Sequence, residues 1–117
     1  GDFGSLKDTG FIFQNFVFNV LREKTKIGSS RICFWRTKDK AEIDFVIDTG
    51  KALIPIEVKY KKLATPEIPR ALRSFVERYK PEKALIINLT LDTTMSLNQT
   101  KIYVIPFYKI MERNFFK

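Results

Sequence analysis

Two segments decide the fold, AEIDFVI at residues 41–47 and IPIEVK at residues 54–59. Both are rich in the β-branched and aromatic residues that favour strands. The sequence between them, Asp48-Thr49-Gly50-Lys51, has the glycine and the polar residues of a hairpin turn. We therefore expect two adjacent antiparallel strands, each carrying charged side chains.

The length of the turn decides which charged side chains meet. Alternate side chains of a strand project from opposite faces, so Glu57 and Lys59 share one face. If the loop comprises residues 49–52, Asp44 lies directly opposite Glu57, and Glu42 lies opposite Lys59. A two-residue loop shifts the partners but keeps the shared face, whereas a three-residue loop separates them. A plain surface hairpin with charged outer residues would show the same spacing.

Composition limits the chemistry that the chain can perform. The 117 residues, 44% of them hydrophobic, are enough for one domain over residues 1–117. The single Cys33 excludes an internal disulfide, and the absence of histidine excludes His ligands and His general bases. Any reaction must therefore use carboxylates, amines, hydroxyls or amides. The formal net charge of +8 favours polyanionic partners such as nucleic acid.

The chain shows no sign of membrane insertion. No apolar run approaches the ~20 residues that a spanning helix needs, and no basic-then-apolar leader opens the sequence. We expect a cytoplasmic protein without a membrane partner. The opening residues 1–4 are typical of the interior of a longer polypeptide, so we expect a domain excised from one.

Hydrophobic periodicity predicts an α/β fold. The expected helices are 11–23, 67–80 and 108–114, the expected strands are 31–37, 41–47, 54–59, 83–89 and 100–106, and residues 90–99 are expected to form a polar loop. The first three strands can form a meander. The helix at 67–80 lets the fourth strand pair in parallel with an earlier one, which gives a mixed sheet flanked by helices.

One polar residue of the first helix is expected to face the interior. Gln14 lies on the apolar side of that helix, in line with Leu21. A buried amide needs partners, because leaving it unsatisfied costs ~1 to 3 kcal/mol. Gln14 either caps a neighbouring backbone group or belongs to a site.

The order of elements and their motifs resemble the PD-(D/E)XK nuclease superfamily. Within it, the chain is similar to the nuclease-like domain at the C-terminal end of many prokaryotic AAA+-type ATPases of unknown function. The resemblance rests on a leading helix, a strand Asp and Glu-x-Lys on the next strand, and is carried by GFIFQNFV at 10–17, FWRTK at 34–38, AEIDFVI at 41–47 and IPIEVK at 54–59. It implies a restriction-endonuclease-like αβββαβ core and an upstream ATPase domain in the same polypeptide.

The resemblance also implies a site for phosphodiester hydrolysis. Asp44 and Glu57 are the expected ligands of Mg²⁺ or Mn²⁺, and the main-chain carbonyl of Val58 completes the shell. Lys59 is expected to orient or deprotonate the attacking water, or to place positive charge against the phosphate. Members of this superfamily often carry a Glu on the first helix, and the matching position here is Gln14, which can ligate but brings no charge.

Basic residues near these segments are candidates for a phosphate track. They are Arg36, Lys38, Lys61 and Lys62, and scattered solvated charge is the alternative. Trp35 is expected in the core rather than as a base-stacking platform. Glu42 is expected either to add a carboxylate beside Asp44 or to pair with Lys59.

Two functions follow from these observations. The first is a metal-dependent nuclease-like domain, a candidate Mg-dependent endonuclease, that binds nucleic acid, with DNA as the first candidate. Whether such a domain forms a homodimer to cut two strands is left open by the sequence. The second is a catalytically inactive accessory or interaction domain of an AAA+-type ATPase.

Overall fold

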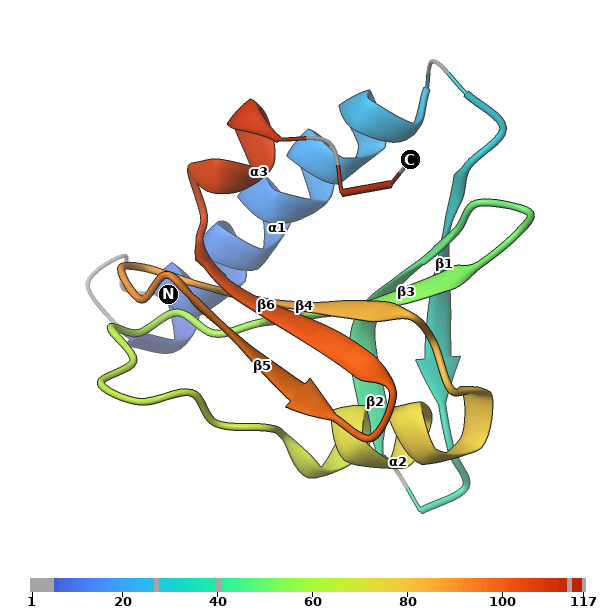
Figure 1. Ribbon diagram of the computed structural model, residues 1–117. Helices are drawn as coiled ribbons and strands as arrows, with labels where there is room; N and C mark the ends of the chain where they lie inside the picture. The colour runs from blue at the N-terminus through green and yellow to red at the C-terminus, as the bar shows by residue number, and fades with distance from the viewer. Residues whose placement is uncertain (1–5, 27, 40, 114, 117) are drawn as a thin grey trace.

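The chain folds into an α/β structure in which a six-stranded mixed sheet is flanked by helices on both faces (Figure 1). The computed structural model describes residues 6–26, 28–39, 41–113 and 115–116. Its elements are α1 (Leu6–Thr25), β1 (Arg31–Arg36), β2 (Glu42–Asp48), β3 (Leu53–Val58), α2 (Arg70–Tyr79), β4 (Lys83–Asn88), β5 (Thr93–Leu97), β6 (Thr100–Pro106) and α3 (Lys109–Glu112).

The sheet combines an antiparallel and a parallel part. Its strand order is β1-β2-β3-β4-β6-β5. Strands β1, β2 and β3 form the expected antiparallel meander, and β4 pairs in parallel with β3 after the crossing through α2. Strand β6 is parallel to β4, and β5 closes the far edge antiparallel to β6. The mixed sheet predicted from the sequence is confirmed.

The β2–β3 hairpin has the four-residue loop that aligns the two candidate carboxylates. Asp48 pairs with Leu53, so the loop comprises Thr49–Ala52, and the Thr49 amide donates to the Ala52 carbonyl at 3.0 Å. The Asp48 carboxylate accepts from the Gly50 amide at 2.8 Å. Gly50 has a φ of 85°, which glycine adopts without steric cost.

Each face of the sheet has its own apolar core. On one face, Phe13, Val17 and Leu21 of α1 pack on the sheet, together with Ile110 of α3. On the other face, α2 packs through its buried residues, Leu72, Phe75 and Val76. The sheet therefore lies between α1 and α3 on one side and α2 on the other, as Figure 1 shows.

The second helix begins three residues later than expected. The predicted start at 67 is wrong, because α2 begins at Arg70 and Pro69 has an extended ψ of 147°. A proline disfavours helical geometry in the residue before it, so Ile68 cannot join the helix. Tyr79, the last residue of α2, is 40% exposed.

The expected polar loop at 90–99 contains a strand. Residues 93–97 form β5, which pairs with β6 through a tight turn in which Leu97 lies opposite Thr100. Asn98 in this turn has a φ of 54°, a conformation that asparagine tolerates better than most residues. Met95 and Leu97 of β5 pack towards the α2 core, and burial alternates along the strand. The alternation is weak in the sequence because the other three residues are threonine and serine.

The first helix is longer than expected and less buried at its N-terminal end. It begins at Leu6 rather than 11 and continues to Thr25. Of the helix predicted at 108–114, the described residues show α3 at Lys109–Glu112, and residue 114 lies outside them. Phe11, Ile12 and Phe16 are 64%, 50% and 40% exposed.

Among the described residues, none of the helices is long and apolar enough to cross a membrane.

Candidate functional site

A β-bulge in β2 lies at the centre of the candidate site. Cys33 of β1 pairs with Val46, but Trp35 pairs with Ile43, so β2 contributes one extra residue between these pairs. Asp44 is one of the two β2 residues within this bulge. Bulges bend a strand and re-aim a side chain, and they are frequent beside active sites.

The carboxylates of Asp44 and Glu57 are interlocked beyond the last paired residues of β2 and β3. The Asp44 amide donates to Oε1 of Glu57 at 3.0 Å, and the Val58 amide donates to Oδ2 of Asp44 at 2.8 Å. Nε2 of Gln14 donates to Oδ1 of Asp44 at 3.0 Å. Gln14 from α1, Asp44 from β2 and Glu57 from β3 therefore meet at one place, as the alignment expected from a four-residue loop requires.

Both carboxyl groups resist ionisation. Glu57 is only 5% exposed, and burial, followed by repulsion from Asp44, raises its pKa to about 7. Burial also raises the pKa of Asp44 above its ordinary value, although the Val58 amide and the charge of Lys59 act in the opposite direction. Perturbed carboxyl pairs of this kind are enriched in functional sites.

Lys59 is close enough to act on both carboxylates through its charge. It follows the last residue of β3, and its amide donates to the Ile87 carbonyl at 2.8 Å, which fixes the backbone beside β4. Its charge lowers the pKa of Asp44 and of Glu57. Among the ion pairs of the described residues, none joins Lys59 to either carboxylate. Its half-buried side chain thus lies next to the pair rather than within it.

Of the two alternatives for Glu42, the pair with Lys59 is wrong. The Glu42 carboxylate forms an ion pair with the Arg36 guanidinium at 2.8 Å, because β1 and β2 place these residues directly opposite each other. The charge of Glu42 still contributes to the raised pKa of Asp44.

The four candidate phosphate-binding residues are exposed at one end of the sheet. Arg36 ends β1 and Lys38 follows it, while Lys61 and Lys62 follow β3. Because β1 and β3 both run antiparallel to β2, these residues lie at the end where β2 begins, near Asp44. Two of them form ion pairs with acidic residues: Arg36 with Glu42, and Lys61 with Glu67 at 3.4 Å.

An open hollow of about 330 Å³ adjoins Asp44. Gln14, Phe34, Arg36 and Glu42 line it together with Asp44. Sequence reasoning did not single out Phe34, whose position in β1 gave no sign that it would be exposed. The hollow gives a ligand access to Asp44 from the β1 side.

Trp35 is partly buried and packs against the core on the α2 face, in line with the role expected of it. Its ring packs edge-on against Phe75 of α2 with centroids 5.3 Å apart, and its Nε1 donates to the Tyr79 hydroxyl at 3.3 Å. Cys33 likewise packs towards the α2 core.

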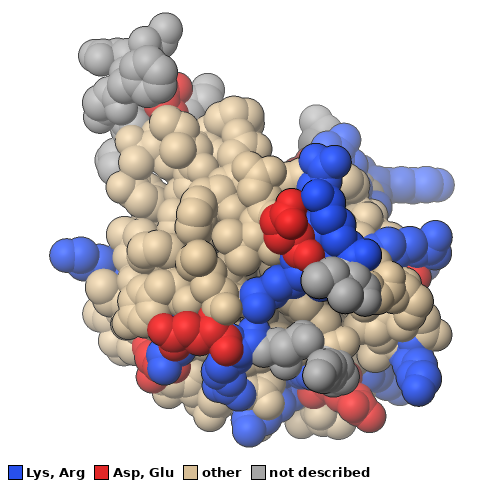
Figure 2. All heavy atoms as spheres, turned by 90° about the horizontal axis from the view of Figure 1, so that it is seen from above, with Lys and Arg blue, Asp and Glu red and all other residues tan. Residues whose placement is uncertain are grey.

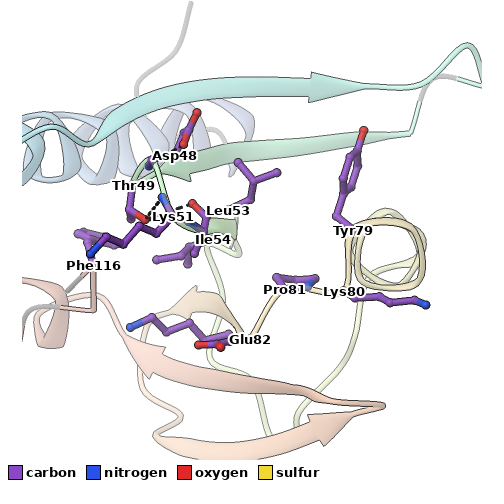
Figure 3. Close-up of a pocket in the computed structure, with 13 residues that line it drawn as sticks. Asp48, Thr49, Lys51, Leu53, Ile54, Tyr79, Lys80, Pro81, Glu82 and Phe116 are labelled. Atoms are coloured by element: carbon purple, nitrogen blue, oxygen red, sulfur yellow. Dashed lines mark hydrogen bonds between the residues drawn. The ribbon is translucent and has the colours of Figure 1, made fainter.

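A larger hollow of about 650 Å³ lies at the opposite end of the sheet (Figure 3). It is formed between the β2–β3 hairpin loop and the segment that joins α2 to β4, with Lys51, Tyr79 and Lys80 among its lining residues. None of the candidate site residues lines it. Its position makes it a useful reference region for charge changes remote from Asp44.

The oxygen-rich donor set suits a hard divalent cation. Within the described ranges, no group of three or more Asp, Glu, His or Cys side chains converges on one point. Two adjacent carboxylates and the Val58 carbonyl remain, and Mg²⁺ typically binds through one or two carboxylates with waters. Gln14 faces Asp44 with its Nε2, so its amide would have to turn over to offer the oxygen to a cation. The repulsion that raises the pKa of Glu57 would be relieved by such a cation.

The comparisons with known proteins identify a family but no activity. A search of curated proteins found no match to the chain. A family model described as a domain of unknown function (DUF4143) matches residues 9–110. Since this match includes most of the 117 residues, the protein belongs to the DUF4143 family.

Proposed function

We propose that this protein is a metal-dependent, nuclease-fold domain that binds nucleic acid and hydrolyses phosphodiester bonds. The observation that carries the proposal is the interlocked pair of Asp44 and Glu57, with raised pKa values and with Lys59 beside it. The order α1, β1–β3 meander, α2 and parallel β4 is compatible with a restriction-endonuclease-like αβββαβ core.

The roles of the residues follow from their chemistry. Asp44 and Glu57 would hold Mg²⁺ or Mn²⁺, with the Val58 carbonyl and the Gln14 amide oxygen as neutral ligands. A divalent cation in this position supplies positive charge at the phosphate and lowers the pKa of a bound water. Lys59, which already acts electrostatically on both carboxylates, would orient the attacking water or stabilise the charge that develops on the phosphate.

The proposal is tested by cleavage of plasmid, single-stranded DNA and RNA over a series of Mg²⁺ and Mn²⁺ concentrations. Asp44→Asn keeps an acceptor for the Val58 amide but removes the charge, so we expect a folded protein without cleavage. Lys59→Met should lose cleavage while retaining Mn²⁺ binding, measured by isothermal titration calorimetry.

The matched control is Asp48→Asn, at the other end of β2. Asp48 accepts from the Gly50 amide and pairs with Arg31, so it tests loss of a β2 carboxylate away from the candidate site. We expect this variant to cleave as the parent does. Cleavage that survives Asp44→Asn, or that is lost equally in Asp48→Asn, would contradict the assignment.

A second function, a catalytically inactive accessory domain of an AAA+-type ATPase, is favoured by a separate observation. Large apolar side chains are exposed on α1 and α3, namely Phe11, Ile12, Phe16 and Met111. Figure 2 shows a broad part of this face without charged side chains. Such patches are typical of protein interfaces. Failure of Mn²⁺ to bind the parent at millimolar concentration would favour this function over hydrolysis.

A further inference from the structure

An exposed aromatic side chain lies on the β1 side of the carboxylate pair. Phe34 is 72% exposed, although it belongs to a strand, and it lies opposite the bulge that contains Asp44. Its ring leans on Phe45 with centroids 6.3 Å apart, and it lines the hollow beside Asp44. One face of a large aromatic ring is therefore available next to the candidate site.

A second aromatic side chain lies on the β3 side. Tyr60 follows Lys59 directly and is 37% exposed. Its ring packs on Phe13 of α1 with centroids 5.3 Å apart, which holds the ring in place. Gln14, the next residue of α1, contacts Asp44. The α1 residue that holds Tyr60, Phe13, is therefore the direct neighbour of the residue that contacts Asp44.

Phe34 and Tyr60 belong to chain segments on opposite sides of β2. Phe34 is on β1 and Tyr60 follows β3, with Asp44 on β2 between them. Neighbouring strands lie about 4.8 Å apart, so the two backbones are about 10 Å apart. Nucleotides stacked in a duplex rise by only about 3.4 Å per strand. Two neighbouring bases that contact one ring each must therefore be unstacked from each other.

Basic residues accompany each ring at this end of the sheet. Arg36 and Lys38 follow Phe34 along the chain, and Lys61 and Lys62 follow Tyr60. Proteins that bind single-stranded nucleic acid combine aromatic side chains, on which bases stack, with basic residues that contact the backbone.

We propose that Phe34 and Tyr60 are stacking platforms for unpaired bases on the two sides of the carboxylate pair, and that the substrate is a single strand. This inference rests on the proposed function and specifies its substrate. A phosphate between two splayed bases would lie over Asp44 and Glu57. The neighbouring lysines and Arg36 would contact the flanking phosphates.

The test measures binding of a short fluorescent oligonucleotide by anisotropy, in EDTA so that cleavage does not interfere. The single strand should bind more tightly than a hairpin duplex of the same composition. Phe34→Ala should weaken single-strand binding about 5- to 100-fold, as expected for loss of one stacked base, whereas Phe34→Trp should retain it. Tyr60→Ala should weaken binding and Tyr60→Phe should not.

Phe11→Ala is the matched control, because Phe11 is 64% exposed on α1 but does not line the hollow. It should leave the affinity unchanged. Equal losses in Phe11→Ala and Phe34→Ala, unchanged binding in Phe34→Ala, or tighter binding of the duplex would each overturn the inference. Circular dichroism should show parent-like folding for both variants, since both side chains are largely exposed.

The outcomes separate this inference from the proposed function. Single-strand binding that depends on Phe34, without cleavage in Mg²⁺ or Mn²⁺, would support the stacking platforms and reject the nuclease. Metal-dependent cleavage of duplex that is unaffected by Phe34→Ala would reject the platforms and support the nuclease.

Discussion

Glu57 has a carboxyl group whose ionisation is opposed by the fold itself. It is nearly inaccessible to solvent, lies beside Asp44 and has a pKa of about 7, against an ordinary value of 4.5. The Asp44 amide hydrogen bond and the charge of Lys59 compensate only in part. A buried pair of carboxyl groups with this property costs stability at neutral pH and suits a cationic ligand.

Without divalent cations, the stability of the protein should fall as pH rises from about 4.5 to about 7. In this window the folded state binds more protons than the unfolded state, because the pKa of Glu57 is raised on folding. The stabilisation is complete below the unfolded pKa and is lost as pH passes the folded pKa, by on the order of 3 kcal/mol. Urea unfolding at several pH values measures it. Glu57→Gln should remove most of this slope, and an identical slope in parent and variant would contradict the assignment of the pKa.

Gln14→Glu should increase affinity for Mn²⁺ about tenfold, because it adds a third carboxylate to the pair. In the absence of metal the same change should destabilise the protein, since the amide that donates to Asp44 is replaced by a repelling charge. Calorimetric titration and thermal unfolding with and without Mn²⁺ measure both effects. Asn15→Glu, one residue along α1 and exposed, is the control. Equal Mn²⁺ affinity in the two variants would show that position 14 is not a ligand position.

At the scale of elements, the sequence was most informative where turn chemistry and alternation agreed. The turn residues around Gly50 and the apolar residues on both sides of them predicted a hairpin between β2 and β3. They did not decide the length of its loop, which the pairing of Asp48 with Leu53 sets at residues 49–52. The bulge at Asp44 could not be predicted, because alternation continues through the sequence while the pairing with β1 skips a residue. The bulge depends on how β2 pairs with β1, and the hydrophobic pattern of β2 alone carries no information about this pairing.

Other elements were missed for local reasons. Strand β5 contains threonine, serine and methionine, so its hydrophobic signal is weak, and its pairing with β6 defines it. The start of α2 followed from Pro69 and was overlooked because the apolar periodicity already begins at Ile68. The candidate site was predictable as a set of residues, whereas the exposure of Phe34 depends on what the rest of the fold leaves uncovered.

Gly50→Ala should lower the free energy of unfolding by about 1 kcal/mol, because Gly50 has a φ of 85° that an L side chain resists. The Mn²⁺ affinity should stay unchanged, since the loop lies at the end of the hairpin remote from Asp44. Gly28→Ala is the control, as Gly28 has no positive φ and only ordinary contacts would form there. A change of Mn²⁺ affinity in Gly50→Ala would mean that the turn controls the register on which the site depends.

At the scale of the whole molecule, the two ends of the sheet provide an internal comparison. The net charge of +8 is spread over the chain, but the candidate phosphate contacts gather where β1 and β3 end. The opposite end has lysines of its own around the larger hollow, Lys51 and Lys80 (Figure 3). Equal charge changes at the two ends therefore distinguish a phosphate track from general attraction of a basic protein to a polyanion.

Removing two lysines near the site, Lys38→Gln with Lys62→Gln, should weaken binding of a single strand and flatten its salt dependence. Each lost phosphate contact should reduce the slope of log affinity against log salt concentration by about 0.7. Lys51→Gln with Lys80→Gln makes the same change of net charge at the other end of the sheet, and the slope should stay close to that of the parent. Anisotropy titrations over a series of salt concentrations measure the slopes. If both double variants lose the same slope, the basic residues act as diffuse charge, and the track along Asp44 and Glu57 is refuted.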